Sequence, residues 1–87
     1  RGVFAHRVDI DRTIDRLAHG WSIERMPLLD LAVLRLGCFE LEHTPETPTG
    51  VVLSEAADLA AEYGTDDSAR FVNGVLAAAA REYRRES

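Results

Sequence analysis

Four residues near position 70 form the local pattern that is best suited to bind a ligand. They are Asp67, Ser68, Arg70 and Phe71, at the start of a stretch with helical periodicity. Free backbone N–H groups at a helix N-terminus attract phosphate, and the Arg70 guanidinium adds positive charge. A partly exposed Phe71 ring could stack on an unpaired base, which is worth about 1–3 kcal/mol. With this pattern, the start of the helix could contact a phosphate and an unpaired base, and an Asp67 carboxylate near the phosphate would lower the affinity by repelling it.

These residues also have a purely structural interpretation, which the sequence leaves open. Asp66 or Asp67 would cap the helix, and Phe71 would fill the core, as aromatic residues on a periodic apolar stripe usually do. Arg35 lies in a very apolar segment, where a guanidinium needs an ion-pair partner or access to water. It is therefore either a structural clamp or a contact with RNA or a partner. Asp30, at the start of that segment, would favour a helix N-terminus through its charge.

Residues that catalyse reactions or bind metals are not arranged as a recognised site. His6, His19 and His43 share no metal-ligand spacing, and the chain has no H-E-x-x-H pattern. Neither a Ser, His and Asp arrangement nor a glycine-rich phosphate loop occurs, so the sequence predicts no enzyme, no cofactor and no metal site. Cys38 is the only cysteine, which excludes an internal disulfide, and we expect it to behave as a small buried hydrophobe.

Hydrophobic spacing predicts an all-helical protein, a compact bundle of about four to five helices. Ile10 and Ile14 lie on one face of the first expected helix, opposite a face of alternating charges, and Gly20 follows as a stop signal. The second helix is apolar on most of its circumference, which is typical of a central helix packed on several sides. The expected helices span residues 3–17, 28–42, 50–63 and 69–83, with a short turn at residues 22–25.

Two finer expectations concern the last two helices. Leu59 and Tyr63 fall on the stripe of the third long helix that we expect to face inward. Asn73 and Gly74 would be a hairpin signal between strands, but helical periodicity continues through them. Because glycine inside a helix costs roughly 1 kcal/mol, we expect Gly74 to mark a point where two helices approach closely.

Bulk properties predict one domain, spanning residues 1–87, near the lower size limit for a self-sufficient core. The hydrophobic fraction of 46% and the charged fraction of 29% are ordinary for a globular protein. The longest apolar stretch, residues 31–41, is interrupted by charges and is shorter than the about 20 residues that cross a bilayer. No segment has the pattern of a secretory signal peptide. We therefore expect a cytoplasmic protein without a membrane contact.

The charge distribution is uneven along the chain, whose formal net charge is −5. Residues 1–25 hold five Arg and four acids, residues 26–64 one Arg and seven acids, and residues 65–87 four Arg and four acids. The net charge argues against a generally basic RNA-binding face, because phosphate binding normally requires one. The acidic excess is confined to the middle segment, which suits a basic protein partner better than RNA.

Three blocks of the sequence resemble the bacterial NusB family. The first block, at residues 21–41, reads WSIERMPLLDLAVLRLGCFEL. It is similar to the family's pattern of a Trp, a connector with leucine and proline, an Asp, and a helix of the form hLRhhhhEL, where h is hydrophobic. The second block, at residues 51–64, reads VVLSEAADLAAEYG and resembles the family pattern VhhNEAhELAKxFG. The third block, at residues 66–76, reads DDSARFVNGVL and resembles the family pattern xxSxKFVNGVLD. It is the most specific of the three blocks. They follow the family's order and cover almost the whole chain.

The chain also departs from the family pattern. Ser54, Ala61 and Ala77 replace the usual Asn, Lys and Asp of these blocks. Family members carry roughly a further half-length of N-terminal helices, including an arginine-rich segment implicated in RNA contact. The resemblance therefore implies the C-terminal part of the fold, as a fragment, a truncated paralogue or a piece trimmed by cloning.

What the resemblance implies is a transcription antitermination adaptor. Such a protein binds boxA, a single-stranded RNA element of ribosomal RNA leader transcripts, together with NusE, a small-subunit ribosomal protein, and joins the RNA polymerase antitermination complex. On this basis Asp30, which matches the family's acidic position, is a candidate NusE contact. The expected RNA-binding residues are Arg35, Asp67, Ser68, Arg70 and Phe71, and the expected partner-binding residues are Asp30 and Arg35.

Two alternatives stay open. The chain could be a piece of the NusB-like front domain of an RNA cytosine methyltransferase, although the arginine-rich ending at residues 81–85 argues against it. It could also be a self-association module that binds no RNA, for example a homodimer, because exposed faces of the helix at residues 28–42 would promote association.

Overall fold

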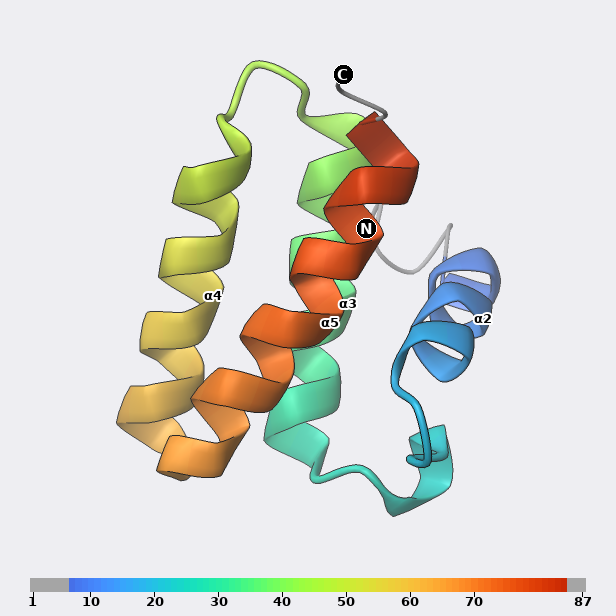
Figure 1. The fold of residues 1–87 in the computed structure, drawn as a ribbon, viewed down its shortest axis with the longest axis vertical. Helices are drawn as coiled ribbons and strands as arrows, with labels where there is room; N and C mark the ends of the chain where they lie inside the picture. Colours follow the sequence, from blue (N-terminus) through green and yellow to red (C-terminus); the bar gives the residue numbers. More distant parts are fainter. Residues whose placement is uncertain (1–6, 85–87) are drawn as a thin grey trace.

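The computed structural model describes residues 7–84, apart from the side chain of Asp66. The regular elements of these residues are all helical, which confirms the expected fold class (Figure 1). The order is α2 (Arg7–Leu17), the short 3-10 helix η1 (Ile23–Arg25), α3 (Leu28–His43), α4 (Thr49–Tyr63) and α5 (Asp66–Arg84).

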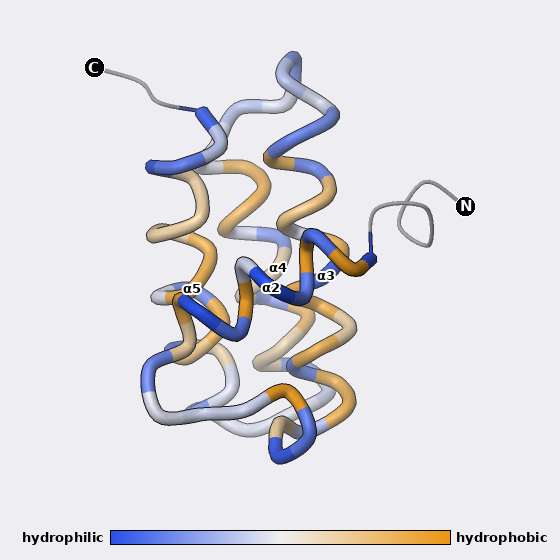
Figure 2. Tube along the Cα trace, turned by 90° about the vertical axis from the view of Figure 1, so that its right-hand side faces the viewer, coloured by the Kyte–Doolittle hydropathy of each residue, from blue (hydrophilic) through white to orange (hydrophobic). Residues whose placement is uncertain are grey.

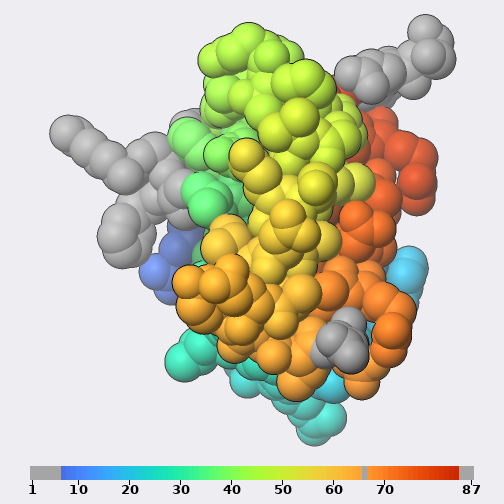
Figure 3. Space-filling view, turned by 90° about the vertical axis from the view of Figure 1, so that its left-hand side faces the viewer, coloured from blue at the N-terminus to red at the C-terminus, as the bar shows by residue number. Residues whose placement is uncertain are grey.

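The three long helices run up, down and up beside one another, and α2 packs against one side of this bundle (Figure 1). Helix α5 contacts both α3 and α4, whereas α2 contacts α3 and α5. Figure 3 shows the opposite face, which α4 covers between α3 and α5. The N-terminal ends of α3 and α5 consequently lie at the same end of the bundle, near η1.

Local sequence explains where the helices begin and end. Pro27 and Pro48 occupy the N-cap positions of α3 and α4, where a missing backbone N–H does no harm. Thr65 caps α5, because its hydroxyl accepts a hydrogen bond from the Ser68 backbone N–H at 3.1 Å. Gly20 has a positive φ of 82°, which glycine adopts without strain, and it reverses the chain after α2.

Apolar residues from all four α-helices form one core. Ile10 and Ile14 of α2 are fully buried, and hydrophilic and hydrophobic residues alternate along this helix in Figure 2. Alanines on α4 and α5 present little side chain, so these helices can lie close to their neighbours. The largest fully buried side chains are Ile10, Ile14, Leu34, Cys38, Leu41, Val52, Val72 and Leu76.

Arginine side chains connect the helices at three places. Arg16 of α2 forms two hydrogen bonds with Glu82 of α5, at 2.5 and 2.8 Å. Arg35 of α3 pairs with Asp11 of α2. Arg84, in the last turn of α5, donates hydrogen bonds to four backbone carbonyls at the α3–α4 connection and to a hydroxyl there. The acceptors are the carbonyls of Glu40, Leu41, Thr44 and Thr47 and the hydroxyl of Thr49.

The expected helix positions agree with the structure, but the expected start of the last helix and the expected inward face of α4 were wrong. The last helix begins at Asp66 rather than at residue 69, because Thr65 supplies the cap. Leu59 and Tyr63 are 39% and 67% exposed, because α4 buries only the narrow stripe formed by Val52, Ala56 and Ala60. The expectations for residues 3–6, including His6, lie outside the described residues.

Gly74 was expected at a close helix contact, and the close contact is at Gly37 instead. A Cβ added to Gly74 would have no atom within 4 Å, apart from its own helix backbone and chain neighbours. A Cβ on Gly37 would lie 2.7 Å from a methyl carbon of Leu76, so α3 and α5 approach closely there. None of the described helices is long and apolar enough to cross a membrane.

Candidate nucleic-acid interface

A pocket of about 360 Å³ lies where the first turns of α3 and α5 meet the connector between α2 and α3. It brings together four of the residues singled out in the sequence, from two helices. Asp30 comes from α3, whereas Asp67, Ser68 and Phe71 come from α5. The pocket lining is completed by Trp21, Pro27 and Thr65.

The start of α5 is held in one conformation by small residues. Ser68 is buried, and its hydroxyl oxygen lies 3.3 Å from that of Thr65. A Cβ on Gly64 would lie 2.8 Å from the Ala60 carbonyl oxygen and 2.9 Å from Ser68 Oγ. Glycine is therefore required at position 64 for α4 to end and α5 to begin at this distance.

Two aromatic rings form one wall of the pocket. The ring centroids of Trp21 and Phe71 are 6.0 Å apart, with planes inclined at 60°. Trp21 is 50% exposed, whereas Phe71 is half-buried and packs against the core. Gly20 turns the chain, and the Trp21 N–H donates a hydrogen bond to the Ala18 carbonyl at 2.8 Å, which fixes the backbone beside the indole. The wall thus offers an apolar surface to a flat ligand.

Asp30 is the most unusual residue of this pocket. It is only 4% exposed, yet its Oδ1 atom is buried without a hydrogen-bond partner among the described residues. A buried polar group without a partner costs about 1–3 kcal/mol, and more if it is charged. Asp30 lies in the first turn of α3, where the helix dipole favours negative charge and offsets part of this cost. A ligand that donates an N–H hydrogen bond to Asp30 Oδ1 would remove the remaining free-energy cost.

Arg70 and Asp67 form an exposed ion pair at the rim. Arg70 Nη2 lies 2.5 Å from Asp67 Oδ1, one helical turn away. The Asp67 carboxylate therefore binds a side chain, whereas the side chain of Asp66, the alternative cap, lies outside the described residues. Exposed pairs of this kind are weak, so phosphate could compete with Asp67 for the Arg70 guanidinium.

Arg35 does not line the pocket. Its guanidinium forms two hydrogen bonds with the Asp11 carboxylate, at 2.8 and 2.9 Å, and both side chains are mostly buried. The hydrogen bonds from Arg35 to Asp11 raise the pKa of Arg35 above its ordinary value. This geometry is that of a structural clamp between α2 and α3, and a contact of Arg35 with RNA or a partner stays a prediction.

Cys38 has the environment expected of a small buried hydrophobe. Cys38 is fully buried, and burial raises the pKa of its thiol to about 12, so the thiol stays protonated at neutral pH. Within residues 7–84, no three His, Cys, Asp or Glu side chains are grouped so that they could hold a metal ion.

Sequence reasoning missed Trp21 as a site residue. It used the Trp only as part of the family resemblance, because a loop residue has no periodicity that would assign it to a face. The available signal was chemical: the one Trp of the chain directly follows a glycine turn and is not part of any apolar stripe. The position of Asp30 at a helix start could be predicted, but the packing of α5 beside it could not.

Comparisons with known proteins agree on one family. The family model described as "NusB family" matches residues 1–81. The transcription antitermination protein NusB of Acidothermus cellulolyticus is 53% identical over 77 residues, which are 88% of this chain and 53% of the relative. That of Symbiobacterium thermophilum is 43% identical over 81 residues, 93% of this chain and 53% of the relative.

A solved structure of T. maritima NusB has the same arrangement of helices. It superimposes with a TM-score of 0.91 and 38% sequence identity, over 95% of this chain and 58% of that chain. The chain thus spans about half the length of the relatives that it matches.

Proposed function

The chain belongs to the NusB family, and on this basis we propose that it is a transcription antitermination adaptor that binds single-stranded RNA of the boxA type. Its proposed protein partners are NusE and the RNA polymerase antitermination complex. The relatives at 43–53% identity are named transcription antitermination protein NusB, and they are about twice as long as the matched region. The proposed mechanism needs no catalysis, because linked weak contacts to RNA and protein reinforce each other through effective concentration.

The observation that carries the proposal is the unpaired Asp30 Oδ1 in a pocket with an aromatic wall. Proteins that read single-stranded RNA stack unpaired bases on aromatic rings and hydrogen-bond to the base edges. Trp21 and Phe71 provide the stacking surface, and Asp30 accepts a hydrogen bond from an amino or imino N–H of the base. The volume of about 360 Å³ lies in the usual range for sites of small flat ligands.

The rim of the pocket suits the phosphate of the bound nucleotide. Arg70 is exposed and sits one residue before the stacking residue Phe71, so its guanidinium can reach a phosphate beside the base. Asp67 holds Arg70 in the free protein and repels phosphate, which keeps the affinity moderate. Ser68 supports the site from below, through its contact with the Thr65 cap.

The groove between α3 and α4 is the surface that suits a basic protein such as NusE. Leu36 and Leu59 are exposed large hydrophobic residues in this groove, and Glu40 and Glu55 flank them (α3 and α4 in Figure 3). An apolar centre with an acidic margin complements a basic partner, because the charges steer association and the leucines supply buried area. The expectations of a NusE contact at Asp30 and of an RNA or partner contact at Arg35 stay predictions.

The base pocket is tested with Asp30→Asn, which keeps the shape of the side chain but removes its charge. We expect boxA-type RNA to bind about tenfold more weakly, the size expected for a weakened hydrogen bond to a charged group. Thermal unfolding should show no loss of stability, because the substitution also removes an unpaired buried charge. Asp58→Asn, on the exposed face of α4, is the matched control. Unchanged affinity for Asp30→Asn would contradict the proposed base contact.

A further inference from the structure

We propose that a second groove, between α5 and the C-terminal end of α2, carries the RNA strand away from the base pocket and towards Arg81. The groove has a volume of about 410 Å³, and its lining includes His19, Arg70, Gly74 and Arg81. The inference rests on the proposed RNA-binding function and extends it, because it assigns a path and additional phosphate contacts to the bound strand.

The groove is continuous with the base pocket. Trp21 and Phe71 line both cavities, so the two aromatic rings form the boundary between them. A strand that places one base against these rings must leave the pocket on one side or the other. On the α5 side, its next nucleotides would lie in the groove.

Charge favours a polyanion as the occupant of the groove. The charged and titratable residues that line it are His19, Arg70 and Arg81, and the lining contains no acid. Arg81 is exposed and has no hydrogen-bond or ion-pair partner among the described residues. An unpaired arginine that borders a groove free of acids suits a phosphate better than the side chain of a protein partner.

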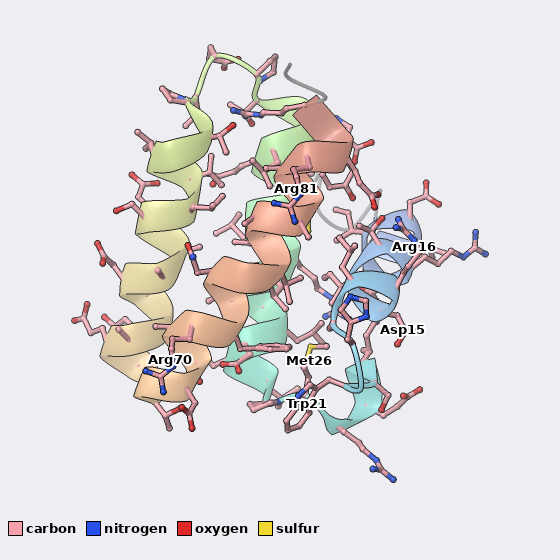
Figure 4. All side chains as sticks on the ribbon, in the orientation of Figure 1. Asp15, Arg16, Trp21, Met26, Arg70 and Arg81 are labelled. Atoms are coloured by element: carbon pink, nitrogen blue, oxygen red, sulfur yellow. The ribbon has the colours of Figure 1, made fainter. Side chains whose placement is uncertain are left out.

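The two arginines are spaced to follow a strand along the helix. Residues 70 and 81 are eleven positions apart, which is close to three helical turns, so both lie on the same side of α5. The helical rise separates them by about 16 Å along the axis. Figure 4 shows Arg70 and Arg81 at two heights of α5, with Trp21 to the right of the lower arginine and at a similar height. Different phosphates of one extended strand can therefore bind the two guanidinium groups.

Gly74 lies between these arginines and has no packing role. A Cβ added there would meet nothing within 4 Å, although glycine in the interior of a helix costs roughly 1 kcal/mol relative to alanine. Glycine often occurs where a ligand approaches the backbone closely. Gly74 and the neighbouring lining residue Ala78 leave the floor of the groove open along this part of α5. An occupant that passes over the helix surface accounts for the missing side chain.

The first test compares Arg81→Gln with Arg12→Gln, an exposed arginine on α2 that lines a different cavity together with Asp11 and Asp15. The probes are a short boxA-type oligonucleotide that only fills the base pocket, and the same oligonucleotide extended at both ends. We expect Arg81→Gln to weaken binding of the extended RNA about three- to tenfold, and to reduce the slope of log K against log salt by about 0.7. The short RNA should bind equally to all three proteins.

A second pair of variants tests the floor of the groove. Gly74→Gln keeps the helix but places a side chain between the arginines, and Gly74→Ala is its matched control. We expect only Gly74→Gln to weaken binding of the extended RNA, with circular dichroism melts showing that both variants fold. Together, the two pairs distinguish a blocked path from a damaged protein.

The outcomes separate the groove from the base pocket. If the short RNA binds but the extended RNA binds no differently to Arg81→Gln and Gly74→Gln, the groove proposal is wrong and the proposed function stands. If the unmodified chain binds neither RNA, both are wrong. If sedimentation shows that Arg81→Gln dissociates a dimer of the chain without affecting RNA, the groove is a self-association surface and the inference is overturned.

Discussion

Trp21 and Phe71, which are far apart in the sequence, face each other with ring centroids 6.0 Å apart at the edge of the base pocket. Phe71 is fixed by the helix that it belongs to, whereas Trp21 sits on a connector and is half exposed. The stacking surface thus combines one ring packed against the core with one ring that is half exposed. The contact between them also joins the α2–α3 connector to α5.

Replacing the indole is expected to weaken RNA binding. Trp21→Ala removes a stacking partner that is worth about 1–3 kcal/mol, so the affinity for boxA-type RNA should fall by about tenfold or more. Because Trp21 is the only Trp, RNA binding should also quench the tryptophan fluorescence of the unmodified chain. Tyr63→Ala, at an exposed aromatic residue of α4, is the control and should bind as the unmodified chain does. RNA binding without any fluorescence change would contradict stacking on Trp21.

Neutralising Asp67 is expected to strengthen RNA binding. Asp67→Asn releases Arg70 from its ion pair and removes a repelling charge beside the proposed phosphate position. We expect tighter binding at low salt, and a smaller gain as the salt concentration rises. The measurement is a salt titration of boxA-type RNA with Asp58→Asn as control. Equal or weaker affinity would count against a phosphate near Asp67.

Breaking the pair between Arg35 and Asp11 is expected to lower stability. Asp11→Asn and Arg35→Gln each weaken the two hydrogen bonds between α2 and α3, which should cost about 1 kcal/mol in the free energy of unfolding. Urea unfolding of both variants and of the double variant measures the coupling. If Arg35 only clamps α2, both variants should affect RNA binding equally. A larger loss for Arg35→Gln would assign it an RNA contact.

Replacing Gly74 and Gly64 with alanine is expected to change the free energy of unfolding in opposite directions. Gly74→Ala should raise the free energy of unfolding by up to about 1 kcal/mol, because the new methyl group meets no other atom and alanine favours the helix. Gly64→Ala should lower it by about 1–3 kcal/mol, because the methyl group would collide with the Ala60 carbonyl and Ser68 Oγ. Thermal or urea unfolding measures both. Equal changes at the two positions would show that the α4–α5 junction tolerates a larger separation.

Cys38 is expected to make stability fall at alkaline pH. Its folded pKa of about 12 is above the model-peptide value of 9.0, so the folded state holds the proton more tightly than the unfolded state. This contribution to stability is complete below pH 9 and is lost as the pH rises towards 12. The difference in unfolding free energy between the unmodified chain and Cys38→Ala should therefore shrink over that window. A difference that does not depend on pH would mean that the thiol ionises equally in both states.

The helical fold could be predicted from the sequence because its signals are local. The spacing of Ile10 and Ile14, and the prolines before α3 and α4, act within one or two helical turns. The positions of the glycines could not be interpreted in this way. Gly37 and Gly74 both sit inside helices, and only the neighbouring helix shows that Leu76 crowds one and nothing crowds the other.

The candidate site could be predicted only in part, for the same reason. Asp67, Ser68, Arg70 and Phe71 belong to one turn of one helix, so a local pattern could identify them. The pocket also needs Trp21 and Asp30, which come from a connector and from another helix. Their contribution depends on how α3, α5 and the connector pack, and this packing is set by the whole core.

Arg84 has a consequence for the order in which the chain can fold during synthesis. Its guanidinium lies at the end of α5 but donates hydrogen bonds to four backbone carbonyls at the junction of α3 and α4. A ribosome produces α3, α4 and their connection well before it reaches this arginine. Until then the carbonyls of Leu41 and Thr47 lack this donor, whereas those of Glu40 and Thr44 already accept the N–H groups of Thr44 and Thr47. The junction of α3 and α4 therefore gains its last hydrogen bonds only when the final turn of α5 docks.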